Sequence, residues 1–469
     1  MSAAISERSS LLIEPKVEPQ DRLDAELFPA LAEAMPENTI SAMLAPSPEV
    51  CAVEWQKFDD DPSYTPNFRV RVDAIAIDTA SLEETGSALY EFRKQLKADT
   101  LNDPETVQMY KWRVNELLGQ LRMVQASQAG NMNLFSRYNR FVYGEADPQV
   151  FSHVVDHYMS LAESAEASED AAVKEAAQAV KGLFGGMPRG DEKFLQPSDE
   201  TFQNVRALHF RERTGYVALV LTGVNSPEGK VTQEDGDPIL RQALGNVGAE
   251  GYEIVDAVGL TWSANNRKEQ LSRPAGYKMG VERLIGLPLG HELRHILEYQ
   301  NGLRSSAALA AVGFDRYERG NEAAGVIGEQ LSYPDFASFA ATPRWSMIIR
   351  RQLMTSLAQG HSGKPMDLRQ VHDAMYAVTY LERMLVKPET AHDEALRRTR
   401  TMIEAVYKGS DGSPGAVYGG YSLYLDGSVD YWNHLENYPE HYEQTERGKF
   451  DMVNERHASF VNAKGIARM

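Results

Sequence analysis

The chain has 469 residues, and 42% of them are hydrophobic, which is enough for a buried core and for more than one domain. Its 67 acidic and 48 basic residues give a formal net charge of −19 at pH 7. A charge of this sign disfavours nucleic acids and anionic membranes as partners.

The first part of the chain predicts a polar tail followed by a mostly helical region. Residues 1–21 are polar, so we expect them to stay unordered unless they dock on the rest of the protein. Alternating apolar residues predict a half-buried strand over 67–77. Asp103 is a predicted helix cap, with Pro104 at the first helical position. Helices are expected over 23–35, 81–97 and 104–126.

The remainder of the chain predicts further helices and a small sheet. Residues 185–190 form a loop with glycine and proline that is a candidate hinge. Strands are expected over 216–221 and 252–260, and either could be the edge that aligns an extended peptide. Residues 409–420 predict a loop rich in glycine and tyrosine. Helices are expected over 148–161, 162–183, 343–357, 367–385 and 390–407.

The most specific motif is H-E-x-x-H, formed by His291, Glu292 and His295. Two histidines four residues apart project from one helix face, so both imidazoles can reach one tetrahedral metal ion. Glu292 lies too far round the helix to be a third ligand. Its carboxylate can take a proton from a water molecule that the metal activates and pass it to a leaving amine. The motif therefore predicts the site of a zinc peptidase.

The residues around the motif favour a helix. Pro288 must lie in its first turn or at a kink in a longer helix that begins near Gly280. Asn301 and Gly302 predict a left-handed stop at its end. Apolar residues at helical spacing predict a buried stripe on a face without the histidines: Leu289, Leu293, Ile296 and Leu297.

The third protein ligand must come from another segment. In one large class of zinc peptidases it is a glutamate on the next helix, and Glu322 fits, with Glu318 one turn earlier as the rival. Small residues over 323–325 would let this helix approach the metal helix closely. Gly325 stands where many zinc peptidases carry an aspartate, so the sequence names no group that orients the histidines.

Other side chains have weaker claims to a role. Tyr424 is the predicted hydrogen-bond donor to the oxyanion, because a phenol donates without carrying charge, and His434 is the alternative. His441 is a weaker candidate. His153 and His157 form a second pair at the same spacing, but no glutamate follows the first histidine, so we expect a surface or supporting pair.

Four blocks of sequence resemble the tyrosine-carboxypeptidase family. Its bacterial members are called QEGLA-motif proteins, and its animal members remove the C-terminal tyrosine of tubulin. Residues 321–325 stand where the family has Q-E-G-L-A, which makes Glu322 the match to its third zinc ligand. The other blocks are 135–144 followed by Asp147 and Pro148, the metal helix with its trailing N-G, and 422–427, similar to Y-L-x-G.

The resemblance implies a zincin-like domain that releases a C-terminal residue. The chain departs from the family as a divergent member would. The family spaces its histidines H-E-x-x-x-H, and it carries R-V-x-R-G on a late helix where residues 377–383 keep at most one arginine. An acidic, tubulin-like substrate would meet long-range repulsion. Arg344, Arg350 and Arg351 could form a basic patch that offsets it, or could be the solvated face of a helix.

We therefore expect an α-rich α+β fold with a flexible tail over 1–21, a mostly helical region over 22–130 and a zincin-like metallopeptidase domain over 131–469. The predicted function is a zinc-dependent carboxypeptidase that acts on a peptide or protein C-terminus. A zinc endopeptidase or aminopeptidase, and a non-catalytic binding or regulatory protein stabilised by metal, are the alternatives.

We also expect a cytoplasmic protein. The single cysteine, Cys51, excludes an intramolecular disulfide and suits a reducing compartment. The first residues lack the basic start and apolar run of a secretory leader. No run of about eighteen apolar residues, the length of a membrane-spanning helix, occurs.

Overall fold

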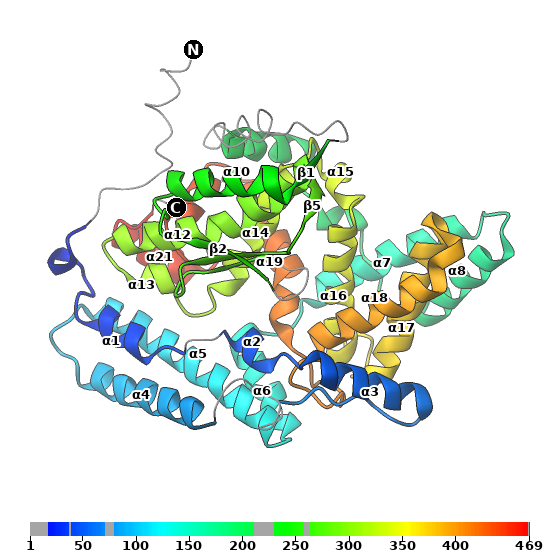
Figure 1. The fold of residues 1–469 in the computed structure, drawn as a ribbon, viewed down its shortest axis with the longest axis horizontal. Coiled ribbons are helices and arrows are strands. Elements are labelled where there is room, and N and C mark those ends of the chain that lie inside the picture. Colours follow the sequence, from blue (N-terminus) through cyan, green and yellow to red (C-terminus); the bar gives the residue numbers. More distant parts are fainter. Residues whose placement is uncertain (1–16, 37–38, 71–78, 211–228, 258–261, 468) are drawn as a thin grey trace, which may run out of the picture.

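The computed structural model describes residues 17–36, 39–70, 79–210, 229–257, 262–467 and 469. The described chain is rich in helices and has two small sheets, which confirms the expected α-rich α+β class. Figure 1 shows three neighbouring groups: the N-terminal helices along one edge, a helical bundle at one end, and the sheet with the central helices. None of the described helices is long and apolar enough to cross a membrane.

The N-terminal helices follow the predicted pattern with some differences. Asp103 caps α5 by accepting from the backbone N–H of Thr106, as predicted. The helix predicted from residue 23 begins only at Leu27. Residues 67–70 form no strand, and most of the strand predicted over 67–77 lies outside the described residues. The helices are α1 (Leu27–Ala34), α2 (Ile40–Leu44), α3 (Pro48–Asp60), α4 (Thr79–Ala98), α5 (Pro104–Gln128) and α6 (Met132–Tyr143).

The bundle is made of five predicted helices. α7 packs on α8 and α16, and α17 packs on α18 and α8. α7 continues through Ala165, beyond the predicted end at residue 161. The helix predicted from residue 162 starts later, at Ala171, because Asp170 caps it. The bundle helices are α7 (Pro148–Ala165), α8 (Ala171–Phe184), α16 (Pro343–Gln359), α17 (Leu368–Val386) and α18 (Ala391–Val406).

Two small sheets of very short strands lie beside the helix that carries the H-E-x-x-H motif. β2 pairs with β4 in parallel, β4 pairs with β3 antiparallel, and β1 pairs with β5 antiparallel. β2 falls within the strand predicted over 252–260, whereas the strand predicted over 216–221 lies outside the described residues. The strands are β1 (Lys230–Thr232), β2 (Glu253–Asp256), β3 (Ser263–Asn265), β4 (Gln270–Arg273) and β5 (Lys278–Gly280).

The H-E-x-x-H motif lies in a continuous helix that starts at Val281, close to the predicted Gly280. Its segments are α11 (Val281–Leu284), the π-helix η3 (Ile285–Glu292) and α12 (Leu293–Arg304). Within it the Leu293 N–H donates to the carbonyl of Pro288, five residues back. A π-helical turn thus accommodates the proline inside the helix. The predicted apolar stripe is buried and packs with α10 (Gln233–Asn246) and the strands.

The helix stop predicted at residues 301–302 is wrong. α12 continues to Arg304, and Gly302 has no left-handed backbone. The glycine is needed for close packing instead, because a Cβ there would lie 2.4 Å from the backbone nitrogen of Ala311 in α13 (Leu309–Val312). A turn signal in the sequence thus marks a helix contact.

The central helix α14 (Glu318–Leu331) packs on one side against η3 and on the other against α19 (Leu423–Leu435). Two glycines set the first contact, since a Cβ on Gly328 would lie 2.6 Å from the carbonyl oxygen of Gly290. The predicted loop over 409–420 leads through a short 3-10 turn, Gly419–Tyr421, into α19. Further helices are α15 (Phe336–Ala340), α20 (His441–Gln444) and α21 (Glu455–Ala463), and residues 199–210 are also helical.

Candidate metal centre

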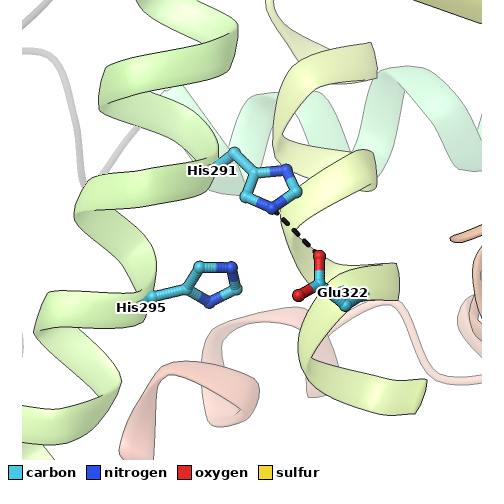
Figure 2. Close-up of side chains that lie close together, drawn as sticks. All are labelled: His291, His295 and Glu322. Atoms are coloured by element: carbon cyan, nitrogen blue, oxygen red, sulfur yellow. Dashed lines mark ion pairs between the residues drawn. The ribbon is translucent and has the colours of Figure 1, made fainter. Parts of the chain in front are cut away.

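Three of the predicted site residues converge. One ligand atom from each of His291, His295 and Glu322 can be chosen so that all lie within 4.8 Å of one another. Figure 2 shows both imidazoles projecting from one helix toward the carboxylate on the neighbouring helix. His291 Nε2 is 3.3 Å from Glu322 Oε2. Two ligands bound to tetrahedral zinc at ~2.0–2.1 Å are also separated by about 3.3 Å.

The chemistry of these donors also fits a metal ion. Glu322 Oε2 is shielded from solvent, yet no hydrogen bond of good geometry reaches it, so a buried anionic oxygen is left without a full partner. Two imidazoles and a carboxylate are a common ligand set for zinc. This cluster can therefore hold a metal ion, and it is the one group of three such ligands among the described residues.

Glycines bring the two helices close enough for this convergence. A Cβ on Gly325 would lie 2.8 Å from the imidazole ring of His291, and one on Gly290 would lie 3.0 Å from the carbonyl oxygen of Gly328. The close approach expected from the small residues after Glu322 is thus present at Gly325. Ala323 faces the opposite helix, near Gly427 of α19.

Glu329 is the residue that orients His291, and the sequence did not predict it. Its Oε1 lies 2.7 Å from His291 Nδ1, which directs Nε2 toward the ligand cluster. Arg344 holds this carboxylate with two hydrogen bonds of 2.8 and 2.6 Å. The spacing of the two glutamates could have indicated this role. Glu329 follows Glu322 by seven residues and so lies on a similar face of α14.

Glu298 plays a weaker version of this role for His295. Its Oε2 is 3.5 Å from His295 Nδ1, and its Oε1 accepts a 2.9 Å hydrogen bond from the fully buried Arg294. Both histidines therefore face a carboxylate on the side away from the cluster. In each case an arginine fixes that carboxylate.

Without a metal ion, the charges of the site favour a proton on His291, at the position where a metal ion would bind. Burial alone would lower the pKa of His291, but the adjacent carboxylates of Glu322 and Glu329 outweigh it and raise that pKa to about 10. Burial opposes ionisation of the two glutamates, yet His291 and, for Glu329, Arg344 lower their pKa values to about 2. A metal ion bound by these groups would displace the imidazolium proton.

Glu292 is buried next to the cluster and is held by the sheet. Its Oε2 accepts a 2.9 Å hydrogen bond from the backbone N–H of Ala264 in β3. The strand thus fixes the carboxylate that the motif assigns as the proton acceptor. β3 is also an edge of its sheet as described, in the order β2-β4-β3.

Tyr424 lies beside the ligands, as its predicted role requires. Its ring is stacked on that of His291 with centroids 6.3 Å apart, and its phenol and the Glu322 carboxylate affect each other's pKa. Burial and the charge of Glu322 raise the pKa of Tyr424, so the phenol keeps its proton and can donate. The alternative donor, His434, is instead hydrogen-bonded to His441 at 2.9 Å.

The rival candidates lie apart from the cluster. Glu318 is not part of the described ligand group, and burial, followed by the charge of Glu116, raises its pKa to about 7. His153 stacks on Phe194 with ring centroids 4.2 Å apart. The second histidine pair thus has no third ligand among the residues that the structure describes.

The three arginines of α16 have different partners. Arg344 pairs with Glu329, whereas Arg350 donates to Glu382 at 2.9 Å. Arg350 is only 3% exposed and so does not lie on a solvated face, whereas Arg344 and Arg351 are partly exposed. Arg351 lies over the ring of Tyr421.

Comparison of the chain with protein-family models, with curated proteins and with solved structures finds no match.

Proposed function

We propose that this protein is a zinc-dependent peptidase. The observation that carries the proposal is the convergence of His291, His295 and Glu322 from two helices, with Glu292 directly after the first histidine. Three protein ligands leave the fourth tetrahedral position for water or substrate. A zinc ion bound there supplies Lewis-acid activation of a water molecule and of the scissile carbonyl.

The protein side chains have distinct tasks in this hydrolysis. Glu292, oriented by the N–H of Ala264, takes the proton of the attacking water and passes it to the leaving amine. Tyr424 donates a hydrogen bond to the oxyanion that develops on the carbonyl. Glu329 holds His291 in the orientation that points Nε2 at the site.

The motif resemblance to the tyrosine-carboxypeptidase family favours release of a C-terminal residue, so the substrate would be the C-terminus of a peptide or protein. We place this activity in the cytoplasm, where the single buried thiol of Cys51 stays reduced. An endopeptidase or aminopeptidase would share the same metal ligands. A metal-stabilised binding protein would share them as well, but would have no use for Glu292.

Two measurements test the proposal. Metal analysis should find about one zinc per wild-type chain and none in Glu322→Gln. Digestion of a peptide library with free and amidated C-termini should then show cleavage of free ends only. Glu292→Gln should keep its zinc and lose about 10²–10⁴-fold in kcat.

Each other outcome selects a rival. Equal cleavage of blocked ends indicates an endopeptidase, and dependence on a free N-terminus indicates an aminopeptidase. Zinc binding with no hydrolysis of any peptide indicates the non-catalytic protein.

A further inference from the structure

Two cations from separate segments lie on one tyrosine ring near the metal centre. The guanidinium carbon of Arg351 in α16 is 4.0 Å from the ring centroid of Tyr421, and Lys408 Nζ is 4.6 Å from it. Lys408 follows the end of α18 and is 4% exposed. Nothing in the predicted mechanism uses either residue.

Neither cation has an acidic partner. Arg344 and Arg350, on the same helix, are paired with carboxylates, but no ion pair joins Arg351 or Lys408 to any described residue. Lys408 Nζ donates to the hydroxyl groups of Ser41 and Tyr421. Arg351 Nε is shielded from solvent and has no hydrogen-bond partner in the described chain. Lys408 is buried and Arg351 is partly buried, and burial of charge without a counter-ion is costly, so an anion bound here would be favoured.

The pair is connected to the metal ligands through two tyrosines. The ring centroid of Tyr421 is 6.2 Å from that of Tyr424, which in turn is 6.3 Å from that of His291. The charge of Glu322 also acts on the pKa of Tyr421. The two cations and the metal ligands thus lie along one continuous run of ring contacts.

We propose that Arg351 and Lys408 bind the free C-terminal carboxylate of the substrate, an assignment that rests on the proposed peptidase function. The planar guanidinium offers two parallel N–H groups that match a carboxylate, and the ammonium adds a point charge. In a chain with a net charge of −19, this local pair supplies the positive charge that an anionic chain end requires. It also explains why a carboxypeptidase of this kind would discriminate against blocked ends.

A binding experiment tests the assignment without relying on turnover. The zinc-loaded Glu292→Gln protein is titrated calorimetrically with N-acetyl-alanyl-tyrosine and with its C-terminal amide. The acid should bind about 10- to 100-fold more tightly than the amide, as expected for charge-assisted hydrogen bonds. Arg351→Gln and Lys408→Gln, each added to this background, should reduce that preference to within about two-fold.

Controls separate charge recognition from folding. Arg350→Gln removes the same charge one residue away and should keep the preference, because its guanidinium is bound to Glu382. Lys408→Arg retains the charge and should keep most of the preference, and thermal melting by circular dichroism verifies that each variant is folded. Equal binding of acid and amide to the parent would overturn the assignment. So would a preference that survives both Gln substitutions, since the carboxylate would then bind elsewhere, for example on the zinc.

The result is independent of the peptidase test. Acid preference that depends on both cations, in a protein that hydrolyses no peptide, would support the subsite and reject the enzyme. Hydrolysis of free and blocked ends alike, with no acid preference, would reject the subsite and leave the zinc peptidase intact.

Discussion

Glu329 is the residue on which the orientation of His291 depends most directly. The sequence could not assign this task, because Gly325 stands at the position where an aspartate was sought. The reason is steric: the ring of His291 lies against Gly325, where any side chain would collide with it. The orienting carboxylate therefore comes from one turn further along α14. The spacing of residues on a helix was enough to predict the metal ligands. The residue that orients His291 depends on how the two helices pack, which the sequence does not show.

The first prediction concerns this support. Glu329→Gln should weaken zinc affinity by about 10- to 100-fold, because a neutral amide no longer fixes the imidazole or raises its basicity. Competition with a chelator of known affinity measures the change. Glu318→Gln, on the same helix but outside the ligand cluster, is the matched control and should bind zinc as the wild type does. An equal loss in both variants would mean that general charge, and not orientation, sets the affinity.

The second prediction concerns Asp426, a buried carboxyl on α19. Burial raises its pKa to about 8, although Arg319 of α14 and the N–H of Asp147 partly offset this. Gln352 of α16 also donates to it, and Asp430 on the same helix adds a like charge. The folded state thus holds a proton that the unfolded chain releases above about pH 4. The stability that this proton contributes is complete below that pH and is lost as pH rises through about 8.

Asp426→Asn should therefore flatten the pH dependence. The melting temperature of the wild type should fall more between pH 5 and pH 9 than that of the variant, and the two curves should converge at the acidic end. Melting curves recorded across this range by circular dichroism decide the matter. Parallel curves would mean that Asp426 is already ionised at neutral pH in the folded protein.

At the scale of elements, the sequence predicted what local signals encode. Caps such as Asp103 and long apolar periodicity gave most of the helices, and the H-E-x-x-H spacing gave the face that carries the ligands. The π-helical turn at Pro288 was not predicted in that form, because its stability comes from packing on α14. The strands are three or four residues long, too short for a clear alternation. Tertiary contacts decide such features.

The third prediction tests the helix crossing that places the ligands. A Cβ on Gly328 would lie 2.6 Å from the Gly290 carbonyl oxygen, and a backbone atom in a helix cannot easily move. Gly328→Ala should cost about 1–3 kcal/mol of unfolding free energy. It should also weaken zinc binding, since separating η3 from α14 draws His291 away from Glu322. Urea denaturation and the chelator assay measure the two effects.

A second glycine provides the control. Gly182 lies exposed in α8 with open space around its Cβ position. Gly182→Ala should leave zinc binding unchanged and stabilise the protein by about 0.5–1 kcal/mol, because alanine favours a helix. A Gly328→Ala protein as stable as the wild type would show that the crossing adapts.

At the scale of the whole molecule, the N-terminal region is joined by a shared core to the part of the chain that carries the candidate metal site. One hydrophobic cluster contains Leu31 of α1 and Tyr110 of α5 together with Leu309 of α13 and Phe450 near the C-terminus. Residues 17–23 also run along the end of the metal helix, where the Leu23 N–H donates to the carbonyl of Ser306. The sequence separated these regions by composition, but could not show contacts between segments so far apart in the chain.

Asp24 is the most specific of these links and carries the last prediction. Its fully buried carboxylate accepts from Tyr110 OH at 2.7 Å and from the backbone N–H groups of Ala308 and Leu309 at 3.0 and 2.9 Å. Asp24→Asn turns one acceptor into a donor that faces these donors, which should cost about 1–3 kcal/mol. Asp24 links the segment before α1 to the start of α13, and α13 packs on α12. Loss of these hydrogen bonds should therefore lower the midpoint of one unfolding transition that both regions share. Calorimetry and zinc release during heating should report the same midpoint. A separate early transition, with zinc retained until a later one, would instead mean that the N-terminal helices unfold on their own.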